Sequence, residues 1–269
     1  MDSQSRFPAA EWWQEDLDLS KDLKREPSGR KRHIEPPTRE EREKLLASLA
    51  LPMQSFEPRM KTLMLRLRRY ADATGDTYHI VHSSCNIGMR LLENNPAEIV
   101  ARGEAAARLA RQAIEYESSN LHAWGLWCDS LVAQGAFADA ENLSWESIRL
   151  FPEDPQRRSK LARLLAENLG RAQEAEQLLR DAILLFPNDR TLGAQLGGTL
   201  SDYLDRPDEA IGILRKSVAE HPNNFHTYTQ LARLLSERGH QKEAIAIMEE
   251  LQHREPGSRF ADELLPRLR

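Results

Sequence analysis

The 269-residue sequence has few cysteines, few aromatic residues and no long apolar run. Its two cysteines, Cys85 and Cys128, are too few for a disulfide framework, so we expect a reducing, cytoplasmic compartment. No stretch approaches the roughly 18 apolar residues of a membrane-spanning helix, and the first residues lack a basic segment followed by an apolar one. The sequence therefore predicts neither a membrane span nor an export signal.

Neither sign of charge dominates the sequence. The 37 lysines and arginines are balanced by 42 aspartates and glutamates, which gives a formal net charge of −5. Proteins that bind nucleic acid through its phosphates usually carry an excess of positive charge. The composition therefore disfavours a general nucleic-acid binder.

Catalytic and phosphate-binding motifs are also absent from the sequence. It contains no Gly-x-Ser-x-Gly, no phosphate loop with Lys-Ser/Thr and no His-Glu-x-x-His. The cluster closest to a metal site is His79, His82 and Cys85, but at this spacing on one helix the outer two side chains point about 240° apart. We therefore predict no enzyme, no cofactor and no metal site, and rank an enzyme built on these three residues last among the alternatives.

The sequence does contain an internal repeat. Proline ends an apolar segment at intervals of 35, 35 and 34 residues, at Pro152, Pro187, Pro222 and Pro256. Twelve residues before each proline stands an alanine: Ala140, Ala175, Ala210 and Ala244. Five residues before these alanines, the sequence has Gly135, Gly170, Asp205 and Gly239. A period of this length is typical of stacked helical hairpins.

Each repeated residue type has a physical reason. The alanine is small because two helices cross closely there, the glycine lets the chain reverse, and proline cannot continue the second helix. A second small residue recurs in the first helix of each unit, as Cys128, Ala162, Gly197 and Ala232. The second and third units carry one extra residue, Leu169 and Leu204, which we place in the turns.

This pattern resembles the tetratricopeptide repeat, a helix-turn-helix unit of about 34 residues. The resemblance covers residues 121 to 256 and implies an all-α fold, a right-handed superhelical solenoid. Trp124 and Tyr228 occupy the aromatic position of the first helix, whereas Arg158 and Gly193 depart from it. The departures put the packing of the two middle repeats in question.

We divide the chain into five segments. Residues 1–37 have the composition of a disordered tail, with an acidic-aromatic stretch and a basic cluster. Residues 38–76 form a helical pair opened by a capping box at Thr38 and Glu41, and residues 77–120 form a degenerate repeat. Four repeats follow in residues 121–256, and residues 257–269 form a capping helix.

The resemblance implies that the first helices line a concave groove that holds a protein or peptide. The larger polar residues at the groove positions are His122, Asp129, Gln156, Arg163, Glu167, Asp202, His226, Arg233 and Glu237. Their charges are mixed, which suits a peptide with alternating charges better than a phosphate backbone. The alternative is that these side chains pair with each other across neighbouring helices.

We therefore predict a non-enzymatic adaptor or scaffold that binds a protein or peptide partner. Trp12, Trp13 and Trp145 are further candidates for docking, and open solenoid ends make a homo-oligomer an additional expectation. The alternative function is a regulator associated with nucleic acid through the basic cluster at residues 24–32 and the basic helix that holds Arg59, Lys61, Arg66, Arg68 and Arg69.

Overall fold

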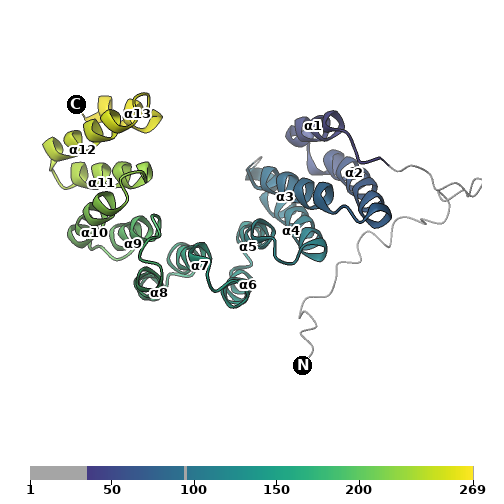
Figure 1. The fold of residues 1–269 in the computed structure, drawn as a ribbon, viewed down its shortest axis with the longest axis horizontal. Helices are drawn as coiled ribbons and strands as arrows, with labels where there is room; N and C mark the ends of the chain where they lie inside the picture. Colours follow the sequence, from purple (N-terminus) through teal and green to yellow (C-terminus); the bar gives the residue numbers. More distant parts are fainter. Residues whose placement is uncertain (1–34, 94–95, 269) are drawn as a thin grey trace, which may run out of the picture. The chain divides into compact units, whose positions relative to one another are not determined.

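The computed structural model describes residues 35–93 and 96–268, and within them the secondary structure is helical (Figure 1). The chain divides into two compact units at Ala136 and Phe137. The described helices include none that is long and apolar enough to cross a membrane. The predicted disordered tail, with Trp12, Trp13 and the basic cluster, lies outside the described residues except for residues 35–37.

The N-terminal unit contains five α-helices and two short 3-10 helices in its described part. Their bounds are α1 Arg39–Ala47, η2 Ser48–Ala50, α2 Met53–Thr74, α3 Tyr78–Glu93, η3 Pro96–Glu98, α4 Ile99–Tyr116 and α5 Leu121–Ala133. The predicted capping box opens α1: Glu41 N donates to Thr38 Oγ1 at 3.2 Å and Thr38 N donates to Glu41 Oε2 at 2.8 Å. These two bonds satisfy backbone donors that the first turn leaves free.

Arg102 of α4 holds η2 and the residue that follows it. Its side chain is fully buried, and one guanidinium nitrogen donates to the carbonyl oxygens of Leu49 at 2.9 Å and Leu51 at 3.0 Å. The same nitrogen lies 3.3 Å from Glu98 Oε2, which compensates the buried charge. This arrangement fixes η2 and the chain after it against α4.

In its described part, the C-terminal unit consists of α6, three helical hairpins and one more helix. The bounds are α6 Phe137–Leu150, α7 Pro155–Glu167, α8 Ala172–Leu185, α9 Leu192–Asp202, α10 Pro207–Glu220, α11 Phe225–Glu237, α12 Gln241–Arg254 and α13 Arg259–Leu268. Each helix packs on the next, and the first helices also pack on one another, α7 on α9 and α9 on α11. The last helix, α13, contacts α11 and α12 and buries Leu265 and Leu268.

The repeated small residues sit where the sequence places them. Ala140, Ala175, Ala210 and Ala244 have no exposed surface. At Gly197 an added Cβ would lie 2.6 Å from Leu214 Cγ, so the backbone of α9 there contacts the Leu214 side chain of α10. The small-residue prediction is confirmed.

The turns between the helices of each hairpin share one left-handed residue. Gly135, Gly170 and Gly239 have φ of 74°, 65° and 80°, and Asp205 has φ 51° at the equivalent place. Aspartate tolerates this region better than most residues, which explains how it replaces glycine there. The extra residues Leu169 and Leu204 lie in these turns, as predicted.

The two departures from the aromatic position are accommodated by other contacts. The Arg158 guanidinium lies 5.2 Å from the Phe186 ring centre and donates to Pro152 O at 2.7 Å. At Gly193 an added Cβ would be 2.9 Å from Ser217 Oγ, so α10 occupies the space of the missing side chain. Both middle hairpins therefore remain packed.

Candidate functional site

Seven of the predicted groove residues lie on the first helices of the C-terminal unit. Gln156, Arg163 and Glu167 are on α7, Asp202 is the last residue of α9, and His226, Arg233 and Glu237 are on α11. All seven are exposed, and α9 packs against both α7 and α11. We call this surface of α7, α9 and α11 the first-helix face.

Side chains on the first-helix face link neighbouring helices. Gln156 Nε2 donates to Thr191 Oγ1 at 2.8 Å, which joins α7 to the start of α9. Arg233 pairs with Asp202 across the α9–α11 contact at 3.3 Å and with Glu237 on its own helix at 2.8 Å. Burial alone would lower the pKa of Arg233, but these two carboxylates outweigh it and raise the pKa, so the guanidinium stays charged.

Acidic groups on the same face influence Tyr203, which follows α9. Burial raises the pKa of the Tyr203 phenol, and the nearby charges of Glu167 and Asp202 raise it further. The phenol is therefore neutral at physiological pH and can donate a hydrogen bond. With a side chain that is 45% exposed, Tyr203 adds an aromatic surface beside the acidic end of the face.

A pocket of about 360 Å³ opens on the face between α11 and α13. Its lining consists of His226, Thr229, Gln230, Arg233, Glu263, Leu264 and Arg267. The three α13 residues were not predicted as site residues, although the amphipathic pattern of residues 259–268 placed a helix there. Next to this pocket, Gly198 leaves a gap, because an added Cβ would meet only Gln230 Nε2, at 3.7 Å.

The remaining predicted docking residues lie elsewhere. His122 and Asp129 are on α5 in the N-terminal unit, where His122 is exposed and Asp129 is half-buried. Their membership of one groove with the seven residues of the first-helix face stays a prediction. Trp145 on α6 points outward as expected, with 48% of its surface exposed.

The side chains of the three candidate metal ligands, His79, His82 and Cys85, lie in different environments. Cys85 is buried, and burial together with the charge of Glu117 raises the pKa of its thiol to about 11. His82 is exposed and stacks on the Tyr78 ring, whereas His79 Nδ1 lies 3.2 Å from an Arg42 guanidinium nitrogen. In the described part of the chain, no three His, Cys, Asp or Glu residues are grouped so that they could hold a metal ion.

The basic row on α2 is largely compensated by carboxylates. Lys61 lies 3.8 Å from Glu57, Arg66 2.6 Å from Glu41, and Arg68 3.8 Å from Asp72. A surface that binds the phosphates of nucleic acid needs positive charges that are not already paired with carboxylates. This geometry weakens the nucleic-acid alternative for the α2 segment.

Comparison with known proteins identifies the repeat. Residues 204–264 match the family model of the tetratricopeptide repeat. The chain has the fold of TTC0263, a thermophilic TPR protein in Thermus thermophilus, with 17% identity, 70% of this chain and 98% of that chain covered, and a TM-score of 0.54. Residues 204–264 are therefore a tetratricopeptide repeat segment, and the stacked helix pairs have the fold of tetratricopeptide repeat proteins.

The comparison also finds similarity to other solved structures. YrrB, a TPR protein with an unusual peptide-binding site, is 17% identical over 74% of this chain and 96% of its own, with a TM-score of 0.42. MamA from Desulfovibrio magneticus RS-1 is 16% identical over 67% of this chain and 97% of its own, with a TM-score of 0.45. No curated protein matches the sequence.

Proposed function

We propose that this protein is a non-enzymatic adaptor that binds an extended peptide segment of a partner along the first-helix face. Tetratricopeptide repeat proteins generally mediate protein or peptide binding, and the proposal assigns this role to α7, α9 and α11. The observation that carries it is the set of seven exposed polar side chains on three packed helices, beside the pocket between α11 and α13.

The chemistry of the face favours a peptide with charges of both signs. Glu167, Asp202 and Glu237 offer three carboxylates, while Arg163 and Arg233 offer two guanidinium groups. Because Arg233 already pairs with Asp202 and Glu237, the negative charge of Glu167 at the end of α7 favours a basic side chain of the peptide there. Tyr203 and the pocket residue Leu264 supply apolar contact for the rest of the segment.

The gap at Gly198 gives a direct steric test. Gly198→Gln would fill the space between α9 and α11 without entering the core, because no backbone lies close to its Cβ position. Gly212→Gln is the matched control, since Gly212 is also a helical glycine, on α10; it is exposed with open space around its Cβ position, whereas Gly198 is half-buried. Both changes should stabilise the helix that carries them by up to about 1 kcal/mol.

Peptides selected from a random display library against the full chain provide the ligand for this test. We expect Gly198→Gln to weaken the selected peptides at least about tenfold, which corresponds to ~1.4 kcal/mol, and Gly212→Gln to leave their affinity unchanged. Selection that yields no specific peptide, or peptides indifferent to Gly198→Gln, would remove the binding site from the first-helix face.

Arginine substitutions test the electrostatic part of the proposal. Arg233 and Arg215 are similarly exposed, at 47% and 51%, and each pairs with a carboxylate of a neighbouring helix. Replacing either by glutamine should change stability by no more than about 1 kcal/mol, as for other surface ion pairs. Only Arg233→Gln should alter the affinity of the selected peptides, because Arg215 lies on α10.

A further inference from the structure

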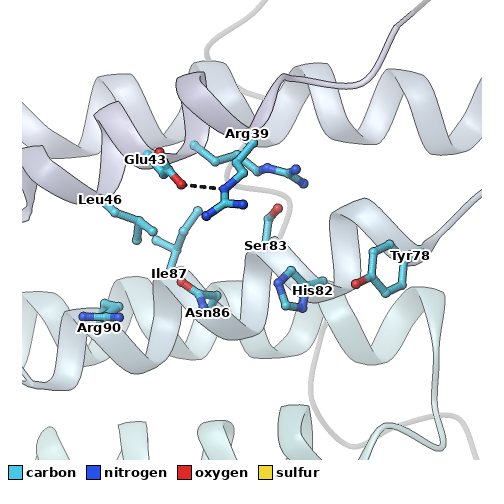
Figure 2. Close-up of a pocket in the computed structure, with 10 residues that line it drawn as sticks. Arg39, Glu43, Leu46, Tyr78, His82, Ser83, Asn86, Ile87 and Arg90 are labelled. Atoms are coloured by element: carbon cyan, nitrogen blue, oxygen red, sulfur yellow. Dashed lines mark hydrogen bonds and ion pairs between the residues drawn. The ribbon is translucent and has the colours of Figure 1, made fainter.

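The N-terminal unit contains a second pocket, between α1 and α3, that the adaptor function does not use. Its volume is about 500 Å³, within the range of roughly 300–1,000 Å³ that is typical of small-molecule sites. Figure 2 shows its lining residues, which are Arg39, Arg42, Glu43, Leu46, Tyr78, His82, Ser83, Asn86, Ile87 and Arg90.

Positive charge predominates in this pocket. Three arginines line it and Glu43 is the one carboxylate among the lining residues, so the balance is two positive charges. Arg39 Nε donates to Glu43 Oε1 at 2.7 Å, and an Arg42 nitrogen donates to His79 Nδ1 at 3.2 Å. Since a guanidinium has five N–H donors, each of these arginines keeps donors for a ligand.

A buried hydroxyl in the pocket wall has no hydrogen-bond partner. Ser83 is 3% exposed, its Oγ is unpartnered, and in Figure 2 this oxygen points from α3 toward α1 and the Arg39 guanidinium. The Asn86 side-chain oxygen is also buried and unpartnered, and turning this amide by 180° would present its NH₂ group instead. An unpartnered buried polar group is costly unless a ligand satisfies it.

The rest of the wall is apolar or aromatic. Leu46 and Ile87 contribute aliphatic surface, and the rings of Tyr78 and His82 stack with centres 5.6 Å apart and planes 7° apart. In Figure 2 these rings lie at one end of the pocket and Arg90 lies at the other. A bare inorganic ion would leave this surface uncovered, whereas a small organic molecule would cover it.

We propose that the pocket binds a small organic phosphate monoester, with its phosphoryl oxygens held by Arg39, Arg42 and the Ser83 hydroxyl. The dianion matches the two net positive charges, and its oxygens accept hydrogen bonds from all three groups. The organic part packs against Leu46, Ile87 and the Tyr78–His82 stack. This site is independent of the first-helix face, which belongs to the C-terminal unit.

Titration of the full chain with phenyl phosphate at low salt tests the proposal by calorimetry. We expect one saturable site, weaker binding of inorganic phosphate because it lacks the apolar part, and weaker binding of benzoate because it is a monoanion. Ser83→Ala should weaken phenyl phosphate about tenfold, as expected for loss of one hydrogen bond to a charged group. Added salt should weaken it further.

Ser84→Ala is the matched control for the serine. Ser84 is fully buried with an unpartnered hydroxyl, but it does not line the pocket. Both serine variants should unfold at temperatures equal to or above that of the unmodified chain, because each loses an unsatisfied buried group. Only Ser83→Ala should lose the stabilisation that phenyl phosphate gives to the unmodified chain.

Arg42→Gln tests the same site independently. Its charge control is Arg59→Gln, at an exposed arginine on α2. Arg42→Gln should weaken phenyl phosphate and Arg59→Gln should not. The proposal is overturned if no saturable binding occurs, if Ser83→Ala and Arg42→Gln bind as well as the unmodified chain, or if benzoate binds as tightly as phenyl phosphate.

Discussion

At the scale of single residues, Ala210 shows how one methyl group sets the distance between two helices. It is fully buried on α10, the helix that packs against α9 and α11, and Ala175 occupies the equivalent place on α8. A larger side chain at either position would have to displace a neighbouring helix, because protein interiors have little free volume.

We therefore expect Ala210→Leu to lower the free energy of unfolding by about 1–3 kcal/mol, as for other overpacked cores. Ala219→Leu, on the exposed side of the same helix, should change it by no more than about 0.5 kcal/mol. Urea unfolding followed by circular dichroism measures both. Equal stability of the two variants would show that Ala210 does not lie at the helix crossing.

At the scale of elements, each hairpin depends on the left-handed residue of its turn. Gly170 has φ 65°, a region in which a Cβ is strained, whereas Gly212 is helical with open space around its Cβ position. The same substitution should therefore act in opposite directions at the two sites.

Gly170→Ala should destabilise the protein by roughly 1–2 kcal/mol, because it places a Cβ in the left-handed region. Gly212→Ala should stabilise it by up to about 1 kcal/mol through helix propensity. Thermal unfolding of the two variants beside the unmodified chain measures the difference. Stabilisation by Gly170→Ala would contradict the left-handed turn.

The hairpins were predictable because their signals are local and periodic. Alanine, glycine and proline recur at fixed spacing, so the crossings and turns could be read from residues 121–256, including the role of Asp205 as a glycine substitute. The first-helix residues could likewise be named, and pairing among them was an alternative prediction, but which residues pair was not predicted. Whether Arg233 pairs with Asp202 depends on side-chain conformations and helix packing that the period does not specify.

The pocket between α1 and α3 was not predictable from the sequence. Arg39 and Arg42 precede Ser83 by some forty residues, with no shared period to connect them. The sequence did mark His82, as part of a candidate metal cluster, and the structure places it instead beside Tyr78 in the pocket wall. Only the fold of the N-terminal unit brings these residues together.

At the scale of the whole molecule, ion pairs join successive second helices of the C-terminal unit. Arg171, before α8, pairs with Glu141 of α6 at 2.8 Å, and Arg215 of α10 pairs with Glu243 of α12 at 2.7 Å. Between them, the carboxylates of Glu176 on α8 and Glu209 on α10 are shared by Arg180 and Arg206. Such networks contribute more than isolated surface pairs.

This network predicts how stability depends on pH. Hydrogen bonds from Arg180 and Arg206 lower the pKa of Glu209 from its ordinary value of 4.5, and Arg171 lowers that of Glu174 in the same way. A carboxylate whose pKa is lowered by folding stabilises the folded state above its unfolded pKa. That contribution is lost as the pH falls through the folded pKa.

Glu209→Gln should therefore lower the melting temperature at pH 7 and have a progressively smaller effect as the pH falls below 4.5, where the unmodified chain loses the same charge. Glu153→Gln is the control, because Glu153 is an exposed carboxylate in the turn after α6 for which the described structure shows no ion pair. Melting temperatures of both variants, measured from pH 7 downward, test whether the charge of Glu209 stabilises the fold. If Glu209→Gln lowered the melting temperature equally at low pH, the glutamate would act through packing and not through its charge. The ion-pair network would then contribute little to the contacts between the second helices.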